Sequence, residues 1–255
     1  MSLFIDVHCH LDFKGIIERL DEVIKNAEKA GLKAIVSSGI TPETNKQMLE
    51  IAKKYPIVKP SFGLYPMDAL TRETDEKNNF DVDTELEFWE KNKDKFVSIG
   101  EVGLDYKNGK DSKMQKEVFQ KVLETAKKLN KPVIIHSRKA ESDALDILES
   151  SGYKKVIMHC FSGKKHLVKR AYDLGYSFSI PTNVVRLQQF QDMVKEINIS
   201  NLFCETDAPF LSPFKDQLNE PAFVVESYKK IAELKRMELE EVEKNIWMNY
   251  QRMFT

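Results

Sequence analysis

Short runs of apolar and often β-branched residues alternate along this chain with longer amphipathic stretches. The short runs have the length of buried strands, and the longer ones repeat apolar residues with the spacing of a helix face. The predicted strands are Leu3–Val7, Lys33–Ser37, Val58–Phe62, Phe96–Gly100, Pro132–His136, Val156–His159, Ser177–Ile180 and Leu202–Glu205. The predicted helices are Ile16–Ala30, Pro42–Lys54, Thr84–Asn92, Lys113–Leu129, Ala140–Ser150, Lys164–Leu174, Val184–Ile197 and Pro221–Leu234, followed by a terminal helix at Leu239–Met253.

Local signals support these helix boundaries. Gly31 follows the first predicted helix and Gly152 follows the fifth, where a glycine readily adopts the left-handed conformation that ends a helix. Thr41 precedes Pro42, which predicts an N-cap with proline at the first helical position. The polar stretch Thr71–Asp83 is expected to be a long loop at the rim of the active site.

The alternation of strands and helices predicts a parallel sheet. Eight such units over 255 residues favour a single (β/α)8 TIM barrel with an extra C-terminal helix, a single domain spanning residues 1–255. A doubly wound open sheet is the alternative. That fold usually carries a glycine-rich phosphate-binding turn after its first strand, and here the same place holds HCHLDFKG.

Charge and cysteine usage narrow the possible functions. The formal net charge is −1, which argues against a broad basic surface for nucleic acid and requires any phosphate to be held locally. Cys9, Cys160 and Cys204 lie in apolar segments without a CxxC pair, as expected for free thiols in a reducing compartment. No signal region or membrane-length apolar run is evident, so a cytoplasmic location is expected, and the sequence indicates no protein partner.

Histidines and carboxylates recur near the ends of the predicted strands. In a barrel of this class, the groups that carry chemistry emerge at the carboxyl ends of several strands. The candidates follow strands one, four, five, six and eight, and they are His8, His10, Glu101, His136, His159 and Asp207. These residue types are common ligands of divalent metals, so the pattern predicts a metal site over the mouth of the barrel.

Six ligands suit two divalent ions better than one, held about 3.5–4 Å apart with one carboxylate between them. Glu101 comes from a middle strand and is the expected bridge. Two such ions carry a charge of about +4, and the carboxylates of Glu101 and Asp207 neutralise two of these charges. The site would keep a net charge of about +2, which suits an anionic substrate. Metals here would lower the pKa of water, and Asp207 is expected to accept the water proton. Zn or Mn fits four histidines better than Mg, which prefers oxygen ligands.

Motifs along nearly the whole chain carry a family resemblance. They are DVHCHLD, GEVGLDY, PVIIHSR, HCFSG, ETDAPFL, NEP and NYQRMF, in this order. The chain resembles the TatD family of metal-dependent deoxyribonucleases, within the amidohydrolase-like barrels; HCFSG together with ETDAPFL is the most specific part. The resemblance implies hydrolysis of DNA phosphodiester bonds, often from the 3′ end toward the 5′ end. It also implies divalent metals, commonly Mg, held by the six residues above.

One position departs from the family pattern. The family usually has a histidine before proline after the third strand, whereas this chain has Tyr65. A tyrosine can donate a hydrogen bond to a phosphate or water, but it does not become cationic at neutral pH. Metal binding is expected to tolerate the change, and substrate preference and rate are what it puts in doubt.

Four further residues are candidates around the site. Arg138 could hold a phosphate with its planar guanidinium or form a surface ion pair. Ser162 precedes a helix whose free N–H groups could receive an anion, or its segment could simply form a turn. Glu205 shares a strand face with Asp207 and could orient water or a histidine, or be a buried structural carboxylate. Asp105 could be a supporting group or a cap.

Two other functions stay open at this point. A hydrolase of small amides, lactones or phosphotriesters could use the same metal geometry. Many relatives of that kind use a modified lysine as the bridge, and Glu101 at that place argues against them. The second alternative is a binding module that has lost catalysis. The intact ligand set argues against it, and Tyr65 argues weakly for it.

Overall fold

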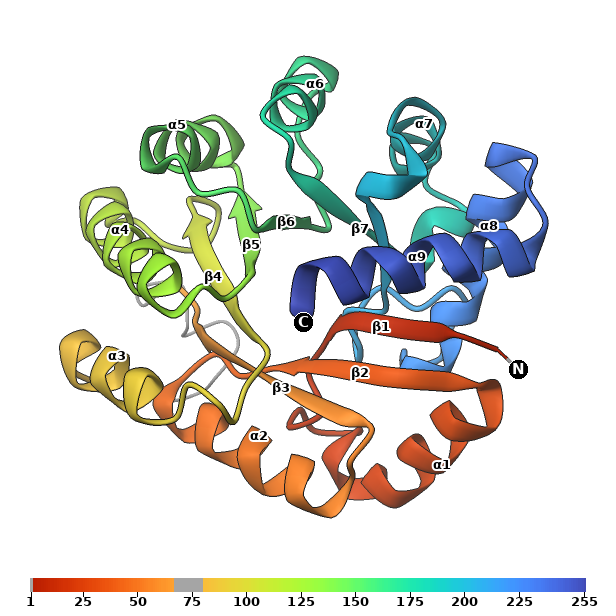
Figure 1. The fold of residues 1–255 in the computed structure, drawn as a ribbon, viewed down its shortest axis with the longest axis horizontal. Helices are drawn as coiled ribbons and strands as arrows, with labels where there is room; N and C mark the ends of the chain where they lie inside the picture. Colours follow the sequence, from red (N-terminus) through yellow and green to blue (C-terminus); the bar gives the residue numbers. More distant parts are fainter. Residues whose placement is uncertain (1, 67–79) are drawn as a thin grey trace.

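Eight parallel strands form one sheet in the order β1 to β8, which curls into a barrel surrounded by helices (Figure 1). The computed structural model describes residues 2–66 and 80–255. The strands are β1 Phe4–Cys9, β2 Leu32–Ser38, β3 Val58–Leu64, β4 Ser98–Asp105, β5 Val133–Arg138, β6 Val156–His159, β7 Ser177–Pro181 and β8 Leu202–Glu205. The predicted TIM barrel is therefore confirmed, and the open doubly wound sheet is excluded.

Helices follow the strands in the predicted alternation. The α-helices are α1 Leu20–Ala30, α2 Pro42–Lys54, α3 Val82–Lys91, α4 Ser112–Leu129, α5 Glu141–Ser151, α6 Lys165–Asp173, α7 Gln188–Glu196, α8 Val225–Lys235 and α9 Leu239–Phe254. Short 3-10 helices are η1 Ile17–Arg19, η3 Thr182–Val185, η4 Ile199–Asn201 and η5 Pro221–Val224. Within these described parts of the chain, no helix is both long and apolar enough to cross a membrane.

The helix-boundary signals act as predicted. Gly31 ends α1 with a φ of 95°, and Gly152 ends α5 with a φ of 68°. Thr41 caps α2 by accepting a hydrogen bond from the backbone N–H of Thr44 at 3.2 Å, with Pro42 at the first helical position. Residues 71–79 of the predicted rim loop lie outside the described residues, and Asp81 at its end caps α3.

Four predicted elements differ from the structure. The first helix begins as the 3-10 turn η1, the seventh is divided into η3 and α7, and the eighth begins as the 3-10 turn η5 before α8. The fourth strand does not end at Gly100 but continues to Asp105, which pairs with Arg138 of β5. Gly103 lies in this continuation, where the two strands approach closely. A glycine is required there because a Cβ would lie 2.0 Å from the His136 carbonyl oxygen. Glycines that suggest a turn in the sequence thus permit two strands to approach closely.

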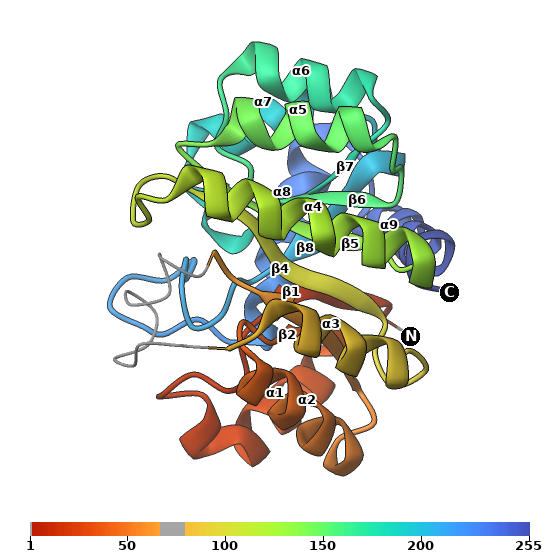
Figure 2. The same cartoon turned by 90° about the vertical axis from the view of Figure 1, so that its left-hand side faces the viewer.

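The first and last strands meet through backbone hydrogen bonds just beyond β8. The Asp207 N–H donates to the His8 carbonyl at 2.9 Å, and the His10 N–H donates to the Ala208 carbonyl at 2.8 Å. Helix α9 covers the opposite end of this seam, since Asn249 donates to the carbonyl of Leu202 at 2.9 Å. In Figure 2, the loop that follows β8 accordingly lies on one side of the barrel, and helix α9 lies on the other.

Candidate metal centre

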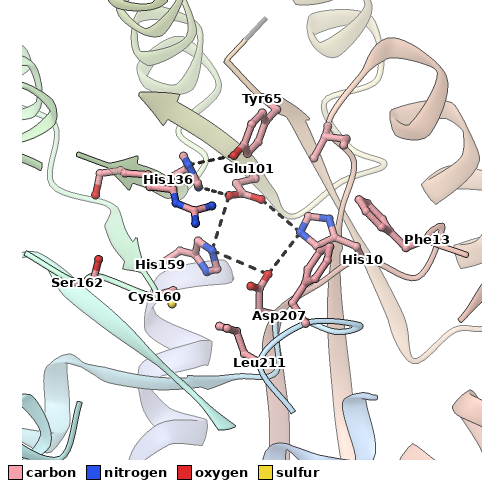
Figure 3. A pocket seen from close by; sticks show the side chains of 14 residues that line it. His10, Phe13, Tyr65, Glu101, His136, His159, Cys160, Ser162, Asp207 and Leu211 are labelled. Carbon is pink, nitrogen blue, oxygen red and sulfur yellow. Dashed lines mark hydrogen bonds and ion pairs between the residues drawn. The ribbon is translucent and has the colours of Figure 1, made fainter. Parts of the chain in front are cut away.

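The structure brings the six predicted side chains together at the carboxyl end of the barrel. Figure 3 shows His10, Glu101, His136, His159 and Asp207 directed toward a common centre. His8 Nε2 lies 3.3 Å from Asp207 Oδ1, and His10 Nε2 lies 3.3 Å from Glu101 Oε2. Among the described residues, two groups of possible ligand atoms each lie within 4.8 Å of one another. One is His8, His10 and Asp207, and the other is His8, Glu101 and His159.

Glu101 reaches the centre because the sheet is irregular around it. The pairing of β4 shifts register on the β3 side between Phe62 and Leu64, and on the β5 side between Ile99 and Val102. Gly63 makes room on β3, since a Cβ there would lie 2.4 Å from the Glu101 backbone nitrogen. Such irregularities commonly redirect a side chain beside a functional site.

Ser38, at the end of β2, orients both histidines of the first strand. Its carbonyl accepts from His10 Nδ1 at 3.1 Å, so Nδ1 carries the proton and Nε2 of a neutral ring keeps a free lone pair. The Ser38 hydroxyl lies 3.1 Å from His8 Nδ1. Both Nε2 atoms are therefore directed toward the carboxylates of Glu101 and Asp207.

Glu205 orients a third histidine from the last strand. Its carboxylate accepts from His159 Nδ1 at 2.8 Å and from the Cys160 backbone N–H at 2.9 Å. His159 Nε2 then faces Glu101, at 3.7 Å from Oε1. A carboxylate behind a histidine fixes its tautomer and raises its basicity as a ligand. The structure thus favours the orienting role for Glu205 over that of an isolated structural carboxylate.

His136 differs from the other three histidines. Its Nδ1 lies 2.5 Å from Glu101 Oε1, and its Nε2 lies 3.4 Å from Asp105 Oδ2. The Tyr65 hydroxyl lies 3.2 Å from the same Nε2 and donates to Asp105 at 2.9 Å. Asp105 also accepts from the backbone N–H of Asn108 at 2.9 Å, so it supports His136 and also stabilises a turn. The sequence suggested that the Tyr65 hydroxyl could donate a hydrogen bond to a phosphate or water. In the structure this hydroxyl donates to Asp105 instead.

Burial and neighbouring charges oppose each other in setting the pKa values here. Burial lowers the pKa of His8, but Asp207 and Glu101 outweigh it and raise the pKa to about 9. Burial also lowers the pKa of His136, yet the charge of Glu101 and a hydrogen bond to Asp105 raise it to about 9. For Glu101, burial raises the pKa, and the positive charge of His136 together with hydrogen bonds from the histidines holds it well below its usual range.

The donor set fits divalent cations. His8 Nε2 is fully buried, and within the described parts of the chain it makes no well-aligned hydrogen bond, although Asp207 Oδ1 and Glu101 Oε2 lie 3.3 and 3.6 Å away. A buried nitrogen of this kind is costly unless something else satisfies it. Cations bound between the imidazoles and the carboxylates of Glu101 and Asp207 would do so, and nitrogen with oxygen donors is the ligand chemistry of Zn and Mn sites.

A cavity of about 470 Å³ opens above this centre. Tyr65, Arg138 and Ser162 line it, as do His10, Glu101, His136, His159 and Asp207. No acidic side chain among residues 2–66 and 80–255 forms an ion pair with the half-buried Arg138, so the alternative of a surface ion pair is not seen there. Ser162 is exposed and precedes α6, which begins three residues later at Lys165.

Sequence reasoning missed several residues that contact this site, among them Ser38, Phe13 and Phe210. Ser38 orients two histidines, but a serine at a strand end is too common to stand out. Phe13 and Phe210 line the cavity, although the sequence reads them as ordinary apolar residues. HCHLDF and DAPF place an aromatic residue three positions beyond His10 and beyond Asp207, and that repeated spacing was the available signal.

Comparison with known proteins gives a consistent result. A family model described as TatD related DNase matches residues 5–255. Deoxyribonuclease TATDN3 of Homo sapiens is 32% identical over 257 residues, covering 98% of this chain and 94% of the human protein. The uncharacterized metal-dependent hydrolase YabD of Bacillus subtilis is 34% identical and covers 99% of both chains. The crystal structure of YJJV, a TATD homolog from Escherichia coli, superposes with a TM-score of 0.85 at 26% identity, covering 98% of this chain and 97% of that one.

Proposed function

This chain belongs to the TatD-related DNase family, and from that premise we propose that it is a metal-dependent hydrolase that cleaves phosphodiester bonds of DNA. The single observation that carries the proposal is the convergence of histidine and carboxylate donors below a cavity that also contains Arg138. Metal donors and a guanidinium in one cavity suit a substrate that is both anionic and hydrolysed.

The six side chains would hold two divalent cations: His8, His10 and Asp207 form one group of donors, and His8, Glu101 and His159 form the other, with His136 beside Glu101. Zn or Mn suits the nitrogen-rich set, and Mg is the third candidate. When bound, the cations would offset the negative charge of the phosphate and lower the pKa of the attacking water. The histidines are preoriented for this task by Ser38 and Glu205.

The residues of the chain would divide the remaining work. Asp207 is more exposed than the other carboxylate at the centre, with 15% of its side chain accessible against 6% for Glu101. It is therefore placed to accept a proton from water that enters the cavity. Its pKa is lowered, since the charge of His159 and hydrogen bonds from His10 and His8 outweigh burial, so it is ionised at neutral pH. Arg138 would bind the phosphate, with Ser162 nearby as a neutral donor.

The burial of the centre supports attack at a strand end. At the floor of the cavity the exposed fraction is at most 7% for each of His8, His10, Glu101 and His159. A phosphate in the middle of a rigid duplex would not easily reach that depth, whereas a terminal nucleotide can enter. The net charge of −1 also argues against extended electrostatic binding of a duplex. We propose action as an exonuclease from the 3′ end.

The test uses the full chain, stripped with a chelator and reloaded with Zn, Mn or Mg. Single-stranded DNA labelled at its 5′ end should shorten stepwise, and a blocked 3′ end should prevent this. His8→Ala and His159→Ala should abolish cleavage while the far-ultraviolet circular dichroism stays native. His166→Ala is the matched control, because His166 is exposed on α6 and lies outside the centre.

Three results would overturn the proposal. The first is full cleavage activity in His8→Ala, which would remove the metal assignment. The second is hydrolysis of a panel of lactones, amides and phosphotriesters with no cleavage of DNA, which would make the protein a small-molecule hydrolase. The third is metal binding without hydrolysis of any of these substrates, which would point to a binding module.

A further inference from the structure

An aromatic wall borders one side of the cavity. Phe13 and Phe210 both line it, and their ring centroids lie 5.4 Å apart with the planes at 79°. The Phe13 ring also lies 5.2 Å from the ring of His10. Phe210 is 39% exposed, so part of a large apolar ring faces solvent at the mouth of the site. In Figure 3, Phe13 lies beside His10, across the centre from Ser162.

The two rings come from separate loops that are each held in place. Phe13 follows β1 and packs against the buried pair Ile40 and Tyr65. Phe210 follows β8, and its carbonyl accepts a hydrogen bond from Asn219 at 2.7 Å. Asn219 is fully buried and also donates to the Thr206 carbonyl at 2.7 Å. The backbone that carries the exposed ring is therefore fixed before any ligand arrives, which favours binding.

The cavity consequently has two chemically different sides. Ser162 and Phe13 lie on opposite sides of the centre in Figure 3. Arg138, at the end of β5, and Phe210, whose ring packs against Phe13, also line the cavity. Arg138 and Ser162 suit a phosphate, while Phe13 and Phe210 offer apolar surface. A nucleotide has the same division, with a charged phosphate and a flat aromatic base. Apolar surface that stays exposed at the mouth of a cavity is typical of a binding surface.

We propose that Phe210, supported by Phe13, is a stacking surface for the nucleobase next to the scissile phosphate. This inference rests on the proposed function and specifies its substrate as an unpaired nucleotide at a strand end. Stacking uses the face of the base, which every base has, so the site accepts all four bases. A base paired within a duplex has its faces covered by neighbouring pairs and must fray before it can stack here.

Another exposed aromatic residue of the same loop supplies the control. Phe214 is 43% exposed and packs edge-on against Phe223, with ring centroids 5.0 Å apart, but it does not line the cavity. Replacing Phe214 removes a similar exposed ring from the same segment without touching the proposed surface. Any effect confined to Phe210 therefore reports on the cavity and not on the loop.

The experiment measures binding and cleavage with the Mn-loaded full chain. The probes are single-stranded oligonucleotides with phosphorothioate linkages at the 3′ end, whose terminal nucleotide carries thymine or is abasic, and affinity is read by fluorescence anisotropy. The intact protein should prefer the thymine probe by roughly 5-fold to 100-fold. Phe210→Ala should lose this preference, Phe210→Tyr should keep it, and Phe214→Ala should resemble the intact protein.

Phe210→Leu separates stacking from general apolar contact, since leucine keeps much of the volume but has no ring face. It should bind both probes alike, and this comparison with Phe210→Tyr holds even if Phe210→Ala folds poorly. An intact protein that cleaves ordinary DNA but binds both probes equally would overturn this inference alone. A protein that neither binds nor cleaves DNA would overturn the proposed function and the inference together. A preference for the thymine probe retained by Phe210→Leu would show that the base is held by general apolar contact, and it would overturn stacking on the Phe210 ring.

Discussion

Asp6 on β1 accepts a hydrogen bond from the backbone N–H of Thr206, just beyond β8, at 3.0 Å. Its second oxygen accepts from the Thr206 hydroxyl, and both residues are fully buried. The contact joins the first strand to the segment that follows the last one. Asp6 lies two residues before His8 and Thr206 lies directly before Asp207, and the backbones of His8 and Asp207 are hydrogen-bonded to each other. The seam that closes the barrel therefore also sets the position of two candidate ligands relative to each other.

Asp6→Ala should destabilise the protein by about 1–3 kcal/mol, because it leaves the buried Thr206 N–H without an acceptor. Urea unfolding followed by circular dichroism measures the loss. Asp21→Ala is the control, since Asp21 is exposed on α1 and pairs with Lys54 at the surface. A loss no greater than that of the control would show that the seam does not depend on this carboxylate.

The same carboxylate should make stability depend on pH. Burial raises the pKa of Asp6 to about 7, although hydrogen bonds from Thr206 oppose the rise. The folded protein therefore binds a proton that the unfolded chain releases near pH 4. This contribution is complete below pH 4 and is lost as the pH rises through 7. Asp6→Asn should remove that part of the pH dependence, as measured by unfolding at intervals between pH 4 and 8, and an unchanged slope would contradict the assignment.

Metal binding should release protons. His8 and His136 have pKa values raised to about 9, and a histidine must be neutral to act as a ligand. Apparent affinity for Zn or Mn should therefore increase between pH 6.5 and 9, about tenfold per pH unit for each proton displaced, and level off above that range. Calorimetry in buffers of different ionisation enthalpy counts the protons. His166→Gln should leave the count unchanged, and a flat profile would exclude these imidazoles as ligands.

Glu205→Gln should weaken metal binding by about 10-fold to 100-fold, because an amide is a poorer partner for the His159 Nδ1–H and lowers the basicity of Nε2. Direct titration of the chelator-treated protein measures the change. The matched control is Glu196→Gln, which removes an exposed carboxylate of α7 that pairs with Lys165. If both variants bind metal with equal affinity, Glu205 does not support His159 as a ligand, and its role is limited to accepting the hydrogen bond from the Cys160 backbone.

Arg138→Ala should raise KM for single-stranded DNA by roughly 10-fold, as expected for the loss of a hydrogen bond to a charged group. It should also reduce the slope of log affinity against log salt by about 0.7, the value for one phosphate contact on a single strand. Arg138→Lys should keep the salt slope, since it keeps the charge. Arg170→Ala on α6, where Arg170 is paired with Asp146, is the control. An effect on kcat alone would place Arg138 outside phosphate binding.

The periodicity of apolar residues was sufficient to predict the barrel, because strands buried on both faces and helices buried on one have different repeats. Helix ends at Gly31 and Gly152 were predictable for a similar reason, since the conformation that ends those helices strongly favours glycine. The candidate ligands were also found in the sequence. Each histidine or carboxylate lies near a strand end, and parallel strands of a barrel end on the same side.

Relations between segments distant in the sequence depended on the tertiary structure. No local pattern reveals that Ser38 orients His8 and His10, or that Phe13 meets Phe210 across nearly 200 residues. The extension of β4 past Gly103 was missed because a glycine is interpreted locally as a break, whereas its role is to allow the approach of the His136 carbonyl. The sequence identified the candidate ligands, since the ability to bind a metal is a property of each side chain. The closed barrel decided which atoms of those residues face one another, because barrel curvature and strand register arise only when all eight strands pair.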